Sequence, residues 1–447
     1  MIFSLRYIVP CYLLVLVNIG QCETLKEVYQ LAKENDHQLQ ADKAGYLAEK
    51  ESTTITRSAL LPQISGGASL NDTRFETDNT PTEDVDETAY EVTLTQSIIN
   101  ASDWYRYRQG SLQSQLAAVR YAAAQQSLIF RVTEAYVNVL SAVDQLTTSQ
   151  ATEKAFAQQL EQTRQRYEVG LISINDVLEA QAAYDSAAAN TFAAEGAIGI
   201  QFDALGVITG KNHDVIASLK QDYPVNPPSP VDGQQWVALA LENNYDLMIS
   251  KLAMDAAGYN TKSTTSDHYP TLTGNVSYGN TDTESSIQPD TDTDIQRISL
   301  TLDIPIYSGG GTSARHRQAY QNEIKAREEY LLLKRNTIQS ARALHLSVVT
   351  DVRQVIARRQ AIISNQSALE AIQAGYDTGT RDIVDVVNAQ NNLFQAKRNY
   401  FNSLYDYVLN SLRLKEVAGR LTPSDLDNLE LWLDVGNQVS RQELLTY

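Results

Sequence analysis

The chain is poor in cysteine. Its 447 residues contain two, Cys11 and Cys22, and both lie within residues 1–22. That segment combines Arg6 with an apolar stretch at 7–17, an order typical of a secretory signal peptide and too short for a membrane-spanning helix. We therefore expect residues 1–22 to be a signal peptide, and the exported chain to have no disulfide and no thiol chemistry. We expect no helical membrane span in the rest of the chain.

Basic residues are also scarce. Lysine and arginine number 36 against 54 acidic residues, so the formal net charge is −18, and removal of Arg6 with the signal peptide makes it −19. So negative a net charge argues against partners held through their phosphates, and we expect no nucleic-acid partner. The five histidines show no metal-ligand spacing, and we find no nucleophile motif, phosphate loop or paired-acid pattern. The sequence thus predicts no enzyme, no cofactor and no metal site.

Two long windows, 111–169 and 312–374, contain neither glycine nor proline. They are rich in residues that favour helix. Apolar residues in the first window recur at alternating steps of four and three, the spacing of a coiled-coil seam, at Leu128, Val132, Ala135, Val139, Ala142 and Leu146. A helix from about 101 to 168 would be about 100 Å long at 1.5 Å per residue.

Four other stretches alternate apolar and polar residues, as transmembrane β-strands do: 63–75, 88–99, 271–279 and 294–306. The last is the clearest, with isoleucine or leucine at every second position from 298 to 306. A soluble sheet with one wet face would give the same pattern. The loops that join each pair, 76–87 and 279–294, carry eleven acidic residues and no basic one, so we expect an acidic rim outside the cell.

The chain contains one plan twice, at an offset of 208–209 residues. "YEVGLISINDVLEAQ" at 167–181 recurs as "YDTGTRDIVDVVNAQ" at 376–390. We therefore divide the mature chain into a first repeat at 23–222, a proline-rich linker at 223–233, a second repeat at 234–420 and a tail at 421–447. Each repeat is predicted to hold a short helical segment, two strands and a long helix hairpin.

Two hairpins give four strands per chain, which cannot close a barrel. An open sheet edge cannot face lipid because its backbone groups would be unpaired. Closure therefore needs several chains, with twelve strands from three copies or eight from two. The helices are too long for a membrane and must project from it as a tube.

Over nearly its whole mature length the chain resembles the TolC family of outer-membrane channel-tunnels, also called outer membrane efflux proteins. The resemblance rests on "LLPQISGGASL" at 60–70, "LTQSIIN" at 94–100, "LDIPIYSGG" at 302–310, and the two long motifs "RYEVGLISINDVLEAQAAYD" and "GYDTGTRDIVDVVNAQNNLFQAKRNY". It implies a mixed transmembrane β-barrel and α-helical coiled-coil tunnel. The family fold is a homotrimer with four strands per protomer in a 12-stranded barrel, continued by a periplasmic α-barrel.

The resemblance also implies a function. The protein would be the exit duct of drug efflux or type I protein secretion, set in the lipid of the outer membrane of a Gram-negative bacterium. Its partners would be a periplasmic adaptor and an inner-membrane transporter. The alternative is a periplasmic or surface coiled-coil protein without a pore, which explains the helices and acidity but not four strands placed symmetrically.

In the family the repeated motif lies at the periplasmic tips of the helix hairpins. The resemblance therefore implies adaptor docking by the turn residues, which are Val169, Gly170, Leu171, Thr378, Gly379 and Thr380. Glycine at such a turn lets a partner backbone approach closely.

The resemblance places a gate at the same tips. Asp385 matches an aspartate that lines the pore, and Asn388 stands where the family carries a second one. Arg381 and Tyr376 match residues that tether the inner helix pair, with Asp176 and Asn175 as expected partners. The simpler alternative is that Asp385, like its twin Asp176, is a solvated acid at a helix N-terminus.

Overall fold

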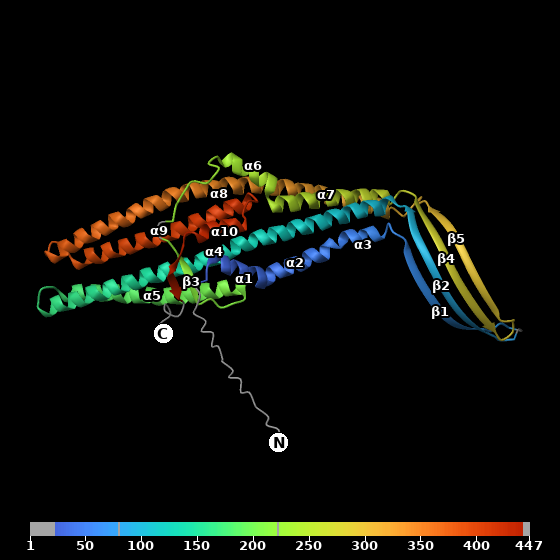
Figure 1. The fold of residues 1–447 in the computed structure, drawn as a ribbon, viewed down its shortest axis with the longest axis horizontal. Coiled ribbons are helices and arrows are strands. Elements are labelled where there is room, and N and C mark those ends of the chain that lie inside the picture. The colour runs from blue at the N-terminus through green and yellow to red at the C-terminus, as the bar shows by residue number, and fades with distance from the viewer. Residues whose placement is uncertain (1–22, 79–80, 221–222, 441–447) are drawn as a thin grey trace, which may run out of the picture.

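A computed structural model describes residues 23–78, 81–220 and 223–440, so the predicted signal peptide at 1–22 lies outside the described residues. The molecule is elongated (Figure 1). A curved β-sheet lies at one end, two long helix hairpins run to the other end, and a group of shorter elements packs beside them near mid-length.

The first repeat contains α1 (Leu25–Asn35), α2 (His37–Lys50), α3 (Ser52–Ser58), β1 (Gln63–Phe75), β2 (Glu83–Ile99), α4 (Ala101–Glu168), α5 (Ile174–Thr209) and β3 (Val215–Leu219). The second contains α6 (Gly233–Asn243), α7 (Tyr245–Ser266), β4 (Thr271–Ser285), β5 (Thr291–Asp303), α8 (Gly311–Asp377) and α9 (Ile383–Val417). The chain then forms α10 (Pro423–Glu430) and β6 (Leu433–Ser440).

The long helix predicted at about 101–168 agrees with α4, whose N-cap is Asn100. The strands are longer than predicted on their acidic side: β2 begins at Glu83 rather than 88, β4 ends at Ser285 rather than 279, and β5 begins at Thr291 rather than 294. At its other end β5 stops at Asp303 rather than at the predicted 306, because Pro305 has no backbone N–H to donate to the ladder. The acidic segments are therefore mostly paired strand, because cross-strand bonds such as Arg74 to Asp84 at 2.6 Å offset their low strand propensity.

The four long strands form one antiparallel sheet in the order β1-β2-β4-β5. Its register aligns Ile64, Leu94, Val276 and Ile298 in one row across the sheet. The next row, on the opposite face, aligns Ser65, Thr93, Ser277 and Arg297. One face is therefore apolar, as a surface facing lipid must be, and the other is polar, as a lumen is.

Successive rows extend this apolar face along the sheet. Its exposed members include Leu70, Val92, Leu300 and Leu302, which are 81%, 51%, 69% and 60% exposed. The outer edges of β1 and β5 have no neighbouring strand among the described residues, so the sheet ends in two open edges.

Shorter helices extend the hairpins toward the sheet. Helix α7 packs along both α4 and α8, and α2 and α3 pack along α4. Gly210 ends α5 and Gly419 follows the C-cap of α9, and they have φ of +70° and +65°, the left-handed geometry common at helix C-termini. Next to them Asp36 and Asn244 cap α2 and α7, so each joint ends one helix and starts another.

The main core lies near mid-length, where α1, α10 and the two-stranded sheet β3–β6 pack against α4, α5 and α9. Buried members from distant parts of the sequence include Leu25, Val132, Phe202, Leu412 and Leu426. The tail at 421–447 therefore contains a helix and a strand that complete this core, and the sequence did not predict β3 or β6.

Helix α5 is long and apolar enough, by length and composition, to be a candidate membrane span, contrary to our expectation that the mature chain has no such helix. One such helix is weak support for a span. The helix packs along α4 and begins at the hairpin tip far from the sheet (Figure 1). Its apolar composition reflects many alanines, which serve close helix packing as well.

Candidate functional site at the helix tips

The two hairpin tips are built alike. Gly170 and Gly379 have φ of +76° and +78°, so each takes the left-handed conformation that glycine adopts most easily. The backbone N–H of Leu171 donates to Arg166 O at 2.9 Å, and that of Thr380 donates to Gly375 O at 2.8 Å. A Cβ at either tip glycine would meet nothing within 4 Å, so both turns present open backbone.

The side chains around the two turns differ. Val169 and Leu171 in the first turn are 70% and 73% exposed, an apolar pair that the chain itself leaves uncovered. In the second turn the hydroxyls of Thr378 and Thr380 donate back to Gly375 O at 3.1 and 3.0 Å. The first tip therefore offers an apolar surface and the second a polar one.

The twin aspartates have different partners. Asp176 accepts from the backbone N–H and the hydroxyl of Ser173 at 2.9 and 3.0 Å, forming a capping box at the start of α5. In the second repeat Asp382 takes the capping role and accepts from the N–H of Asp385 at 2.9 Å. The carboxylate of Asp385 is thus not needed to cap its helix, unlike that of Asp176.

Asp385 and Asn388 lie one turn apart on α9. Arg381 Nη1 lies 3.3 Å from Asp385 Oδ2, and the two side chains are 57% and 39% exposed. Within one chain the expected partner of Arg381, Asp176, accepts from Ser173 instead, and Asn175 is exposed in the first turn of α5. Pairing of Arg381 with Asp176 between chains stays a prediction.

Tyr376 is 6% exposed and packs with Ile383 and Val386 in a small core at the tip. Its hydroxyl is buried and has no hydrogen-bond partner among the described residues. The guanidinium of Arg166 lies 4.6 Å from the ring centroid, and its Nη2 lies 3.3 Å from Asp377 Oδ1. Within the chain Tyr376 is therefore held by Arg166 rather than by the expected Asp176 or Asn175.

Sequence reasoning missed Arg166. The position equivalent to Arg166 in the second repeat is Gly375, so the repeat gives no signal at this position. Arg166 joins the tip of α4 to the tip of α8 through one cation–π contact with the buried Tyr376 and one ion pair with the exposed Asp377, each on the order of 1 kcal/mol. Such a link is easily broken.

A sheet with one apolar face at one end and two long helix hairpins running to the other end are the parts expected of one protomer of a membrane channel with a long duct. The family model described as "Outer membrane efflux protein" matches residues 28–211 and 236–420. The outer membrane protein TolC of Vibrio cholerae is 35% identical over 420 residues, covering 93% of this chain and 95% of that protein. The chain belongs to the TolC family of outer membrane efflux proteins.

Other comparisons agree. The alkaline protease secretion protein AprF of Pseudomonas aeruginosa is 28% identical over 90% of this chain and 86% of that protein. The solved structure of CusC superposes with a TM-score of 0.79 at 16% identity, over 88% of this chain and 92% of that chain. The predicted fold class is confirmed, and the protein is a non-enzymatic efflux or secretion channel of the Gram-negative outer membrane. Channels of this family form trimers in efflux systems.

Proposed function

We propose that this channel is the exit duct of a tripartite export system, in which its helix tips dock to a periplasmic adaptor that links it to an inner-membrane transporter. The supporting observation is the open surface at the first tip, where Val169 and Leu171 are exposed beside the left-handed Gly170. Exposed apolar side chains around accessible backbone suit close contact with another helical tip.

The same tips form the gate in this proposal. Three copies of Asp385 from three protomers face the pore at its narrowest point, with a neutral ring of Asn388 beside them. The Arg166 contacts join the two tips of one protomer, and their low strength allows docking to separate them. The exposed Arg381–Asp385 pair lies within one hairpin tip, so Arg381 can exchange Asp385 for a partner on a neighbouring tip. Family membership leaves the alternative of a filament without a pore unsupported.

Docking is tested with Gly170→Glu. A glutamate there strains the left-handed turn, its Cβ meets no atom of the chain within 4 Å, and its charge lies where an adaptor would pack. We expect loss of efflux or secretion in cells with a normal yield of membrane-inserted trimer.

Gly170→Ala is the matched control, because it strains the turn without adding a charge. It should retain most of the export activity. Equal loss of export with both substitutions, together with a low trimer yield, would show that the glycine only shapes the turn, and docking at this tip would be rejected.

A further inference from the structure

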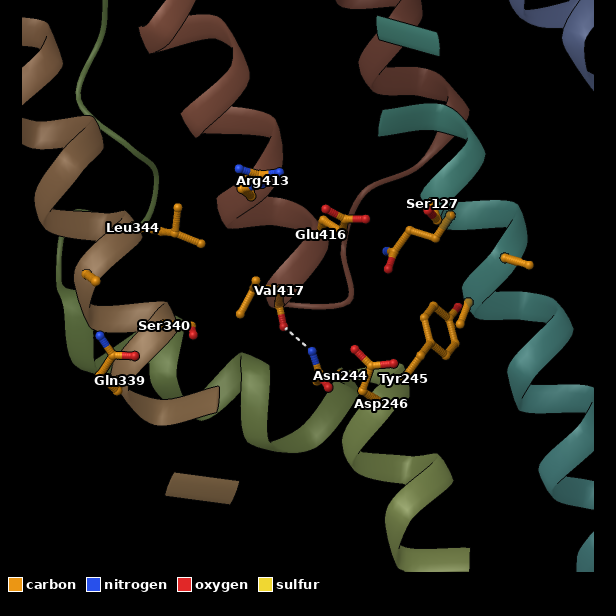
Figure 2. A pocket seen from close by; sticks show the side chains of 14 residues that line it. Ser127, Asn244, Tyr245, Asp246, Gln339, Ser340, Leu344, Arg413, Glu416 and Val417 are labelled. Atoms are coloured by element: carbon orange, nitrogen blue, oxygen red, sulfur yellow. Dashed lines mark hydrogen bonds between the residues drawn. The ribbon is translucent and has the colours of Figure 1, made fainter. Parts of the chain in front are cut away.

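A cavity of about 650 Å³ lies where the N-terminus of α7 meets the C-terminus of α9, between α4 and α8 (Figure 2). Asn244 Nδ2 donates to Val417 O at 3.0 Å and joins the two helix ends. Figure 2 shows Glu416 and Asp246 on opposite sides of this joint, one from α9 and one from α7. Neither carboxylate forms an ion pair within 4.0 Å among the described residues.

The equivalent joint in the first repeat is built differently. There Asp36 caps α2 and forms an ion pair with Arg131 of α4. At the offset of 208 residues, these positions become Asn244 and Gln339, which are both uncharged. The ion pair that closes the first joint is thus absent from the second, where the cavity lies.

The charges at the second joint have no counterpart in the first. Arg413 and Glu416 correspond at an offset of 209 to Ala204 and Val207, and Asp246 corresponds at 208 to Gln38. Joining two helices end to end therefore does not require these charges. The carboxylates of Glu416 and Asp246 outnumber the single arginine, Arg413, that lines the same cavity, so their presence has to be explained by something other than the helix joint.

The cavity opens on the side of the long helices opposite to the one that α6 and α10 cover. Lys415 of α9 reaches Asp425 of α10 at 2.7 Å, and Arg413, two residues earlier, points about 200° away on the helix. On α8 the face that packs on α6 carries Ala341, and Gln339 is turned about 200° from it. An open duct requires α6 and α10 to lie outside it, so the cavity faces the lumen.

Glu416 is poorly solvated there. Burial raises the pKa of its carboxyl to about 7, the like charges of Asp246 on α7 and Glu134 on α4 act in the same direction, and Arg413 on α9 opposes them. The α8 residues that line the cavity are all uncharged: Gln339, Ser340, Ala343 and Leu344. A bound cation would favour the ionised carboxyl, and apolar lining from Leu344, Val417 and neighbouring alanines would accept its hydrocarbon part.

We propose that this cavity binds organic cations with an apolar body, as a site in the duct wall between Glu416 and Asp246. The ammonium or iminium group contacts the carboxylates, and the apolar body lies along Leu344 and the ring of Tyr245. This inference rests on the transport function of the family and does not require docking at the tips.

The test uses ethidium, an aromatic monocation, and the purified full-length trimer in a non-ionic detergent, with empty micelles as the blank. Fluorescence titration at low salt gives the Kd at pH 6 and pH 8. We expect the wild-type Kd to fall about tenfold between these values as Glu416 loses its proton. Glu416→Gln should raise the Kd at pH 8 at least about fivefold and remove the pH dependence.

Ala343→Trp tests the cavity itself, since it fills the space and keeps every charge. It should also raise the Kd at pH 8 at least about fivefold. Glu328→Gln, at an exposed position elsewhere on α8, is the matched control and should leave both the Kd and its pH dependence unchanged.

Two results would overturn the site: a Glu416→Gln protein that binds like wild type, or an Ala343→Trp protein whose binding is not weakened. The second result would mean that the overall negative charge of the lumen is enough to bind ethidium without this cavity. Gly170→Glu should bind ethidium normally, so failure of tip docking and failure of this site are separate outcomes.

Discussion

At the scale of single residues, equivalent residues of the two repeats can be identical and still have different roles. Asp176 and Asp385 occupy equivalent positions, yet Asp176 closes a capping box and Asp385 does not, because Asp382 caps its helix instead. The sequence left open whether Asp385 is only a helix-start acid. Because Asp382 caps the helix, the carboxylate of Asp385 is available for a role at the pore. The pore itself forms only when the chains assemble.

Ion block tests that role. Three Asp385 carboxylates at one constriction would bind multivalent cations, and Asn388 beside them would leave only one charged ring. We expect weak block of the planar-bilayer conductance by a trivalent cation added on the periplasmic side. Asp385→Ala should remove the block and Asn388→Asp should strengthen it. Unchanged block and cation selectivity in Asp385→Ala would return Asp385 to the simpler alternative.

A second residue-scale prediction concerns Asp144 of α4, which accepts a hydrogen bond from the hydroxyl of Tyr405 on α9. Burial raises the pKa of Asp144 from 3.8 to about 6, although the hydrogen bond from Tyr405 opposes the change. The folded protein therefore binds more protons than the unfolded one between these values. Stability falls as the pH rises from about 4 to about 6, and the loss is complete above that range.

Asp144→Asn keeps an acceptor for Tyr405 and removes the buried charge. We expect it to increase the free energy of unfolding by about 1–3 kcal/mol at pH 8 and to change it little at pH 4. Thermal melting of the trimer in detergent at the two pH values measures this. The exposed Asp185→Asn should change neither midpoint, and an equal gain at both pH values would contradict the assigned cause.

At the scale of elements, glycine is needed for two different reasons: for its left-handed backbone at a hairpin tip, and also for its lack of a Cβ where helix ends meet. Gly379 at the tip needs glycine only for its positive φ, since a Cβ there meets nothing within 4 Å. Gly419, next to the α7–α9 joint, has the same backbone requirement, and a Cβ there would also lie 2.1 Å from Asn243 O. That overlap is with backbone and cannot be relieved by a side-chain rotation.

Alanine substitutions should therefore differ in effect. We expect Gly379→Ala to reduce stability by about 1–2 kcal/mol, the usual strain of a left-handed residue. Gly419→Ala should reduce it by at least about 3 kcal/mol, because the chain just after α9 and the C-terminal end of α6 at Asn243 must separate. Chemical denaturation of both proteins in detergent gives the comparison. Similar losses for the two would mean that the joint can shift without penalty.

Elements with a strong local pattern could be predicted from the sequence. The breaker-free windows indicated α4 and α8, and alternation indicated four strands, although it ended them too early where acidic residues continue the ladder. Strands β3 and β6 could not be predicted because they are short and pair residues more than 200 positions apart. The contact of Arg166 with Tyr376 likewise depends on which hairpins lie together, which no local pattern encodes.

At the scale of the whole molecule, the four-stranded sheet needs further strands at both of its edges. Its apolar face is exposed and its edge strands β1 and β5 each lack an outer neighbour among the described residues, while α5 and α8 carry exposed apolar residues such as Phe192, Ile200 and Leu346. Unpaired backbone groups cannot face hydrocarbon. Copies of the chain must therefore join β1 of one protomer to β5 of the next, and the same association brings neighbouring helix surfaces together.

The pairing of these edges is tested with cysteines, since residues 23–447 contain none of their own. Ser69→Cys on β1 is combined in turn with single cysteines along β5, because the register between protomers sets which position faces it. One or two of these pairs should form a disulfide, and it should link different protomers. The control joins Ser69→Cys to Ala89→Cys, positions that already pair between β1 and β2, so its disulfide should form within one chain.

Non-reducing gel electrophoresis distinguishes the two kinds of bond, and the mass of the purified protein in detergent gives the number of chains. We expect three chains and twelve strands, because each protomer brings four strands and the barrel has no free edge. A mass of two chains would mean an eight-stranded barrel. A stable monomer in the membrane fraction, with β1 and β5 cysteines bonded inside one chain, would contradict closure by several chains.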